Sequence, residues 1–112
     1  MFETLLTHEK LAEILSALRT GLKDLLGDQL EAVYLYGSQA RGDAQPDSDI
    51  DILIILKGDF NYFSMIDQTS HITAKLSLEN DVVISTAFTS VDNFTGLSTP
   101  FLINIRREGI HV

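Results

Sequence analysis

Residues 37–54 read GSQARGDAQPDSDIDILI, and this segment decides both the expected fold and the expected site. It opens with a glycine and a serine, directly after an apolar run that ends at Tyr36. It closes with Asp49 and Asp51 at the start of a second apolar run, which reaches Leu56. Short apolar runs bounded by turn residues are typical of buried strands. The segment therefore predicts a strand, a turn with a polar loop, and a second strand in the middle of a sheet.

The two aspartates at the end of this segment are the first candidates for chemistry. Only one residue separates Asp49 from Asp51, so on a strand their side chains point to the same face. Two carboxylates held this close repel each other unless a proton or a cation relieves the repulsion. Mg²⁺ prefers carboxylate oxygens together with water and substrate phosphates, so it suits such a pair. Taken alone, the pair is more often two solvated acids at a loop-to-strand junction.

Gly37 and Ser38 favour a binding site over two solvated acids. A glycine at the end of a strand lets the backbone approach a ligand closely. Amide groups that lead into a helical turn favour anionic phosphates, and the Ser38 hydroxyl adds a further hydrogen bond. An ordinary Gly-Ser turn is the alternative for these two residues alone. A Gly-Ser turn, ten residues and then two alternating aspartates together predict a phosphate and metal site.

Two other motifs share part of this spacing, but the sequence lacks residues that each of them requires. Gly37 and Gly42 have the glycine spacing of a P-loop, but Asp43 stands where the lysine should be. The alternating aspartates that begin at residue 47 match the first three ligands of an EF-hand. However, Ile52 replaces the required glycine of that motif, and Gly58 replaces its bidentate glutamate.

Three further side chains are candidates for the same site. A two-metal site needs a third acid. Asp81 is expected to open the third strand beside Asp49 and Asp51, as a metal ligand and as a base; an exposed acid at a strand start is the alternative. Arg41 is expected to offset phosphate charge, because its fork geometry matches phosphate oxygens; the alternative is a solvated loop arginine. Lys75 can reach a bound phosphate from its helix, although a helix lysine is usually only solvated.

The rest of the chain alternates helices and strands. Leucine and isoleucine at three- and four-residue spacing predict a helix between Thr7 and Gly27. A second long helix is expected over residues 59–78, with Phe63, Ile66, Ile72 and Leu76 facing inward. The remaining elements are expected as strands at 32–36, 50–56, 82–87 and 110–112, a short helical piece near 91–94, and a helix over 100–107. Alternation of this kind predicts a layered α/β or α+β fold in a single domain, residues 1–112.

Composition excludes several classes of protein. The chain has 112 residues and a formal net charge of -8, with sixteen acids against eight lysines and arginines. It has no basic cluster, so direct binding to nucleic acid is not expected. It has no cysteine, which excludes disulfides and thiolate metal sites. The longest unbroken apolar run, residues 52–56, is too short to cross a bilayer, and the N-terminus shows no signal peptide. We therefore expect a cytoplasmic protein with no membrane partner.

The segment GSQARGDAQPDSDIDILI resembles the signature of the minimal nucleotidyltransferases of the polymerase-beta-like superfamily. DVVIS, from Asp81, is similar to the part of that family that carries its third carboxylate. The ending TPFLINIRREGIHV is similar to the family's last helix and strand, so the resemblance covers nearly the whole chain. It implies an α+β fold, in which helices pack on a small mixed sheet.

The resemblance also implies an activity. The expected reaction moves a nucleoside monophosphate from a triphosphate, here AMP from ATP, to a hydroxyl, and pyrophosphate leaves. Gly37 and Ser38 would then bind phosphate, and Asp49, Asp51 and Asp81 would hold one or two Mg²⁺ ions. Family members are commonly the antitoxin of a pair with a HEPN-type ribonuclease toxin, and the transferase can adenylylate a tyrosine of that toxin.

Three interpretations of function stay open from the sequence. The first is an antitoxin enzyme that nucleotidylates a partner protein. The second is a transferase for a small molecule such as an aminoglycoside. The third is a module that neutralises its partner by binding alone. Because no stretch of the chain is left for an acceptor domain, we expect a partner protein or a second copy of the chain to supply that part.

Overall fold

Four strands form one mixed sheet in the computed structural model, which describes residues 6–96 and 98–112. The expectation about a signal peptide concerns residues that lie outside this range. The strands are β1 (Leu30–Tyr36), β2 (Ile50–Leu56), β3 (Ile84–Ser90) and β4 (Ile110–His111). Their order is β3-β2-β1-β4. Strand β2 pairs antiparallel with β1 and parallel with β3, while β4 pairs antiparallel with β1. The expected second strand is therefore an inner strand.

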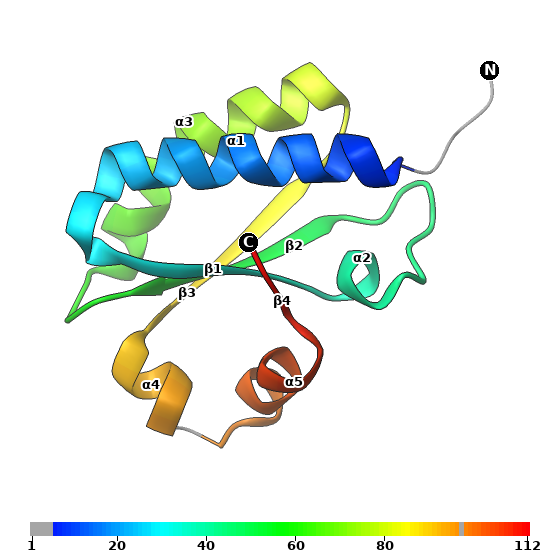
Figure 1. The fold of residues 1–112 in the computed structure, drawn as a ribbon. Coiled ribbons are helices and arrows are strands. Elements are labelled where there is room, and N and C mark those ends of the chain that lie inside the picture. Colours follow the sequence, from blue (N-terminus) through cyan, green and yellow to red (C-terminus); the bar gives the residue numbers. More distant parts are fainter. Residues whose placement is uncertain (1–5, 97) are drawn as a thin grey trace.

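Helices cover both faces of the sheet (Figure 1). The long helices α1 (His8–Leu26) and α3 (Tyr62–Asn80) lie on one face, and a 3₁₀ turn (Gly27–Gln29) links α1 to β1. The short helices α4 (Val91–Gly96) and α5 (Pro100–Glu108) lie on the other face. A single turn, α2 (Ser38–Arg41), follows β1. The predicted α+β fold, a small mixed sheet with helices packed on it, is confirmed.

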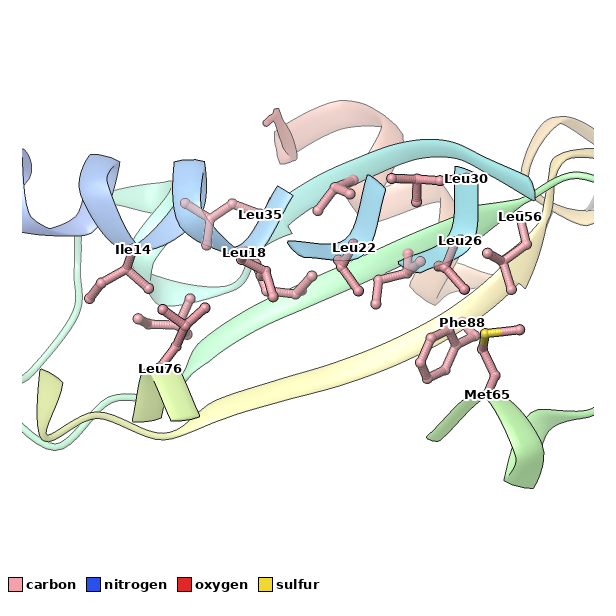
Figure 2. Close-up of a cluster of buried hydrophobic side chains, with 14 residues drawn as sticks. Ile14, Leu18, Leu22, Leu26, Leu30, Leu35, Leu56, Met65, Leu76 and Phe88 are labelled. Atoms are coloured by element: carbon pink, nitrogen blue, oxygen red, sulfur yellow. The ribbon is translucent and has the colours of Figure 1, made fainter. Parts of the chain in front are cut away.

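The larger core lies between the sheet and the two long helices (Figure 2). Helix α1 contributes an apolar stripe with four-residue spacing: Ile14, Leu18, Leu22 and Leu26. The facing side chains of β2 occupy its even-numbered positions. The odd-numbered Leu53 and Ile55 belong to a smaller cluster with α5 on the opposite face. Because strand side chains alternate, Asp51 lies on the α5 side of the sheet.

The inward face of α3 differs from the predicted one. Phe63 and Ile66 were expected to face inward, but their exposed fractions are 82% and 41%. The buried residues of α3 are Met65, Thr69 and Leu76. This helix begins at Tyr62, with Asn61 as its N-cap, rather than at residue 59. The buried stripe consequently runs through residues 65, 69 and 76, and the two apolar residues near its start lie outside that stripe.

None of the helices within residues 6–96 and 98–112 combines the length and the hydropathy that a membrane crossing requires.

Candidate functional site

The site is built around the turn that follows β1. At Gly37 the backbone has φ 73° and ψ -156°, a conformation that is essentially confined to glycine. The Gly37 carbonyl accepts hydrogen bonds from the amides of Ala40 and Arg41, at 3.1 and 3.0 Å, and these bonds close the turn. A Cβ at this position would collide with Oδ2 of Asp51. The glycine is therefore required twice, by the backbone conformation and by the carboxylate that lies against it.

Both predicted carboxylates lie on the same face of the sheet. Asp51 pairs in register with Tyr36 of β1 on one side and with Ser85 of β3 on the other. Asp49 directly precedes β2, and its Oδ2 accepts a hydrogen bond of 2.9 Å from the Ser85 hydroxyl. Since this serine is the neighbour of Asp51, the bond places the Asp49 side chain on the Asp51 side. The spacing of the two aspartates predicted this arrangement.

The electrostatics of the pair follow from burial and from like charge. Burial raises the pKa of Asp51, the negative charge of Asp49 raises it further, and the nearby Arg41 lowers it. Burial likewise raises the pKa of the Tyr36 hydroxyl, with a further contribution from the Asp51 charge. The ionised form of Asp51 is thus disfavoured in the folded chain unless a cation is added.

This donor set fits a divalent cation. Two carboxylates on one face, one of them with a raised pKa, are the kind of oxygen ligands that Mg²⁺ prefers. Among residues 6–96 and 98–112, no group of three or more acidic, histidine or cysteine side chains is placed to hold a metal ion. An ion held here would therefore take its remaining ligands from water and from phosphate oxygens.

Asp81 is not brought to this pair, and the prediction that it opens the third strand is wrong. It ends α3 in the left-handed conformation, with φ 53° and ψ 49°, which aspartate tolerates better than most residues. Strand β3 begins only at Ile84, and its register sets Ser85 beside Asp51. The exposed Asp81 instead lines a separate hollow with Asp47.

The two predicted cations have different positions. Arg41 lies at the end of α2, where its Nε is 3.2 Å from Oδ2 of Asp43 and its Nη1 is 3.9 Å from Oε2 of Glu108. Lys75 lies on α3, which covers the opposite face of the sheet, and its Nζ is 3.9 Å from Oε1 of Glu79 (Figure 1). Arg41 therefore belongs to the site, whereas Lys75 has the solvated position that is usual for a helix lysine.

A cleft of about 240 Å³ opens beside the Gly37 turn, between that turn and α5. Its lining residues come from the end of β1, from α2 and from one face of α5: Tyr36, Gly37, Arg41, Phe101, Asn104, Ile105 and Glu108. The Phe101 ring meets the Tyr36 ring edge-on, with centroids 5.4 Å apart. Sequence reasoning missed this cleft, because the only available signal was the helical spacing of the α5 residues, which does not reveal what they face.

Comparison with known proteins identifies the family. Residues 20–94 match the family described as Polymerase beta, Nucleotidyltransferase, and this range includes the Gly37 turn and both aspartates. The chain belongs to that family. The predicted relationship to the polymerase-beta-like nucleotidyltransferases is confirmed.

One named relative and two solved structures are also similar to this chain. Protein adenylyltransferase MntA of Thermococcus cleftensis is 30% identical over 77% of this chain and 85% of its own length. A variant of the toxin–antitoxin MntA-HpeT has a chain of similar fold, with a TM-score of 0.59 at 20% identity, covering 96% of this chain and 72% of that one. A toxin–antitoxin structure with AMP-PNP has a TM-score of 0.58 at 20% identity, covering 88% and 69%.

The contact between Gly37 and Asp51 leads to a prediction about stability. The substitution Gly37→Ala should lower the free energy of unfolding by about 1–3 kcal/mol, because the backbone conformation suits only glycine and the new Cβ collides with Asp51. Gly42→Ala is the matched control. Gly42 also has positive φ, at 83°, but nothing lies within 4 Å of an added Cβ. Urea unfolding of both variants should show the larger loss at Gly37, and equal losses would contradict the role of the contact.

The raised pKa of Asp51 leads to a prediction about pH. The folded chain binds a proton at this carboxyl more tightly than the unfolded chain does, so ionised Asp51 lowers stability at pH values above its raised pKa. Below the ordinary value of 3.8 this effect disappears. Asp51→Asn should therefore raise the free energy of unfolding at pH 7 in the absence of divalent ions. The gain should shrink as the pH falls through the Asp51 pKa.

Urea unfolding at a series of pH values measures this gain. Asp67→Asn, at an exposed position on α3, serves as the control and should give a much smaller change. A gain at Asp51 that is the same at pH 4 and pH 7 would show that the burial and repulsion of an ionised carboxylate are not its cause.

Proposed function

We propose that this protein transfers AMP from ATP to a hydroxyl of a partner protein, and that it acts as an antitoxin by modifying a tyrosine of a HEPN-type toxin. The observation that carries this proposal is the placement of two carboxylates on one face, one of which, that of Asp51, lies directly against a glycine turn. This arrangement suits a magnesium-bound triphosphate, because it offers carboxylate ligands for the ion and open backbone for the phosphates.

Each residue has a distinct part in the proposal. Asp49 and Asp51 would hold Mg²⁺, and the ion would supply positive charge to offset that of the triphosphate and of the leaving pyrophosphate. Gly37 keeps the turn free of a side chain, and Ser38 adds a hydroxyl beside it. Arg41 brings a cation to the same turn, where it can exchange its exposed carboxylate partners for phosphate oxygens.

The proposed reaction is a single displacement at the α-phosphorus. The acceptor oxygen forms a bond to that phosphorus, and the bond to the oxygen that bridges the α- and β-phosphates breaks. Pyrophosphate leaves with the electron pair of that bond, while the acceptor proton passes to solvent. Positioning and charge stabilisation carry such a transfer, so the rigid strands that hold Asp49 and Asp51 matter more than a strong base.

The cleft beside the turn suits the nucleoside of the donor. Gly37 of the turn and Arg41 both line this cleft, so phosphates bound at the turn would direct the attached ribose and base toward α5. There the exposed Phe101 ring offers a stacking surface, and the Asn104 amide offers one donor and one acceptor edge. A planar base with hydrogen-bonding edges matches both groups.

A protein acceptor is favoured over a small molecule by the relatives. The relative from Thermococcus cleftensis is named as a protein adenylyltransferase. Two structures of similar fold are toxin–antitoxins, and one of them contains AMP-PNP, an analogue of ATP.

Label transfer from α-phosphate-labelled ATP tests the proposed reaction. With a HEPN-type partner that carries an R-x(4)-H motif, the wild-type chain and Mg²⁺ should label the partner at a tyrosine. Asp49→Ala and Asp51→Ala should each reduce the rate by about 100-fold or more, because stabilisation by a metal ion is worth several kcal/mol. Asp67→Ala, on the opposite face of the sheet, should label the partner at the wild-type rate.

The outcomes separate the three interpretations. Label on a free aminoglycoside without any partner would favour the small-molecule transferase. A stable complex that silences the toxin without label, and equally well in the Asp49→Ala variant, would favour neutralisation by binding alone. Label on a partner tyrosine that is lost when this tyrosine becomes phenylalanine supports the proposal.

The cleft leads to a second kinetic prediction. Phe101→Ala should raise the KM for ATP by about tenfold, because stacking of a base on an aromatic ring is worth about 1–3 kcal/mol. Phe63→Ala is the matched control, since this phenylalanine is 82% exposed on α3 and lies on the other face of the sheet. Initial rates of label transfer at increasing ATP concentration measure both variants. An unchanged KM in Phe101→Ala would show that the nucleoside does not bind in this cleft.

A further inference from the structure

We propose that Ser85 completes this metal site as a positioning residue, in the place where a third acid was expected, by orienting the carboxylate of Asp49. This inference rests on the proposed metal site and adds to it a residue that sequence reasoning did not select.

The register of β3 places Ser85 at the centre of the site. Ser85 is the in-register partner of Asp51, because β3 runs parallel to β2 with Ile84 opposite Ile50. The amide of Ile50 donates to the carbonyl of Val83 at 2.8 Å, so the pairing of the two strands is already established at the end where the aspartates lie. A side chain at position 85 is therefore adjacent to both carboxylates.

The hydroxyl of Ser85 has a specific partner. It donates to Oδ2 of Asp49 at 2.9 Å, which lies within the range of an O–H···O hydrogen bond. Asp49 is exposed and precedes the first residue of β2, so the strand ladder does not by itself orient its side chain. The bond from Ser85 restrains the carboxylate plane and leaves Oδ1 available. A ligand held by such an outer hydrogen bond loses less conformational entropy when it binds an ion.

Ser85 occupies the sheet position from which a third acid could join the pair. Within the described ranges no third acid joins Asp49 and Asp51, and Asp81 lies four residues before Ser85 in the chain, at the end of α3. The side chain that the sheet does bring beside the pair is a neutral donor. It adds no negative charge beside the two carboxylates.

Titration with Mn²⁺ tests this inference without any transfer reaction. The full-length protein is titrated calorimetrically as wild type and as Ser85→Ala, Ser85→Thr and Ser85→Asp. Ser85→Ala should bind Mn²⁺ about tenfold more weakly, which is the scale of losing a hydrogen bond to a metal ligand. Ser85→Thr keeps a hydroxyl at the same position and should retain the wild-type affinity.

The acidic variant should change the affinity for Mn²⁺ in the opposite direction from Ser85→Ala. Ser85→Asp places a third carboxylate beside the pair, so it should bind Mn²⁺ more tightly than the wild type. It should also have a lower melting temperature without the ion and a larger rise in melting temperature when the ion is added. Ser70→Ala, which removes an exposed hydroxyl on α3, should leave the affinity unchanged and serves as the control.

Two results would overturn the inference or its basis, and they are distinguishable. If Asp49→Ala abolishes Mn²⁺ binding while Ser85→Ala binds as tightly as wild type, Ser85 has no positioning role, although the proposed metal site stands. If Asp49→Ala and Asp51→Ala both bind Mn²⁺ like wild type, the metal site itself is refuted. Circular dichroism of each variant before titration ensures that folded proteins are compared. A Ser85→Thr variant that folds but binds Mn²⁺ weakly would also contradict the inference.

Discussion

The carboxylate of Asp51 rests against the backbone of Gly37, and the geometry of the site depends on this contact. It joins the end of β1 to the beginning of β2 at the point where Tyr36 and Asp51 pair. Any side chain at residue 37 would displace the carboxylate, and any shift of β2 by one residue would turn Asp51 to the other face. The contact therefore couples backbone conformation, strand register and the position of a charged group in a single constraint.

The large core gives this constraint its rigidity. Strands β1 and β2 are held by a continuous apolar layer under α1 and α3, while the acids lie on the other face, beyond the smaller cluster with α5. Because the strands are fixed from behind, a shift of the backbone does not relieve the repulsion between Asp49 and Asp51. The larger core and the two acids thus lie on opposite faces of one sheet. On the face with the acids, ionised Asp51 lowers stability, because its pKa is raised in the folded chain.

Most of the fold could be predicted from the sequence, because several elements have strong local patterns. The periodicity of α1 and the unbroken apolar run of β2 are strong signals, and both elements lie close to where they were expected. The alternation rule placed both aspartates on one face. The start of α3 and the start of β3 were misplaced, because a cap at Asn61 and a left-handed turn at Asp81 interrupt patterns that look continuous in the sequence.

What the sequence does not contain is the register between distant strands. Ser85 and Asp49 are 36 positions apart in the chain, and the parallel pairing of β2 with β3 brings them together. The cleft arises from the position of α5 near the end of β1. Neither leaves a local pattern. Motif reasoning thus located the acids and the glycine, whereas the residues that orient or surround them became visible only from tertiary contacts.

The position of Arg41 has one more consequence. Its guanidinium already lies between Asp43 and Glu108, two exposed carboxylates whose attraction in water is weak. These acids hold the arginine at the mouth of the cleft with little binding energy of their own. In the proposed function, an incoming phosphate would meet a cation that is already held in place, so less side-chain entropy would be lost on binding than with a freely rotating arginine. Two of the many acids of this chain would then orient the one arginine that lines the cleft in the described part of the chain.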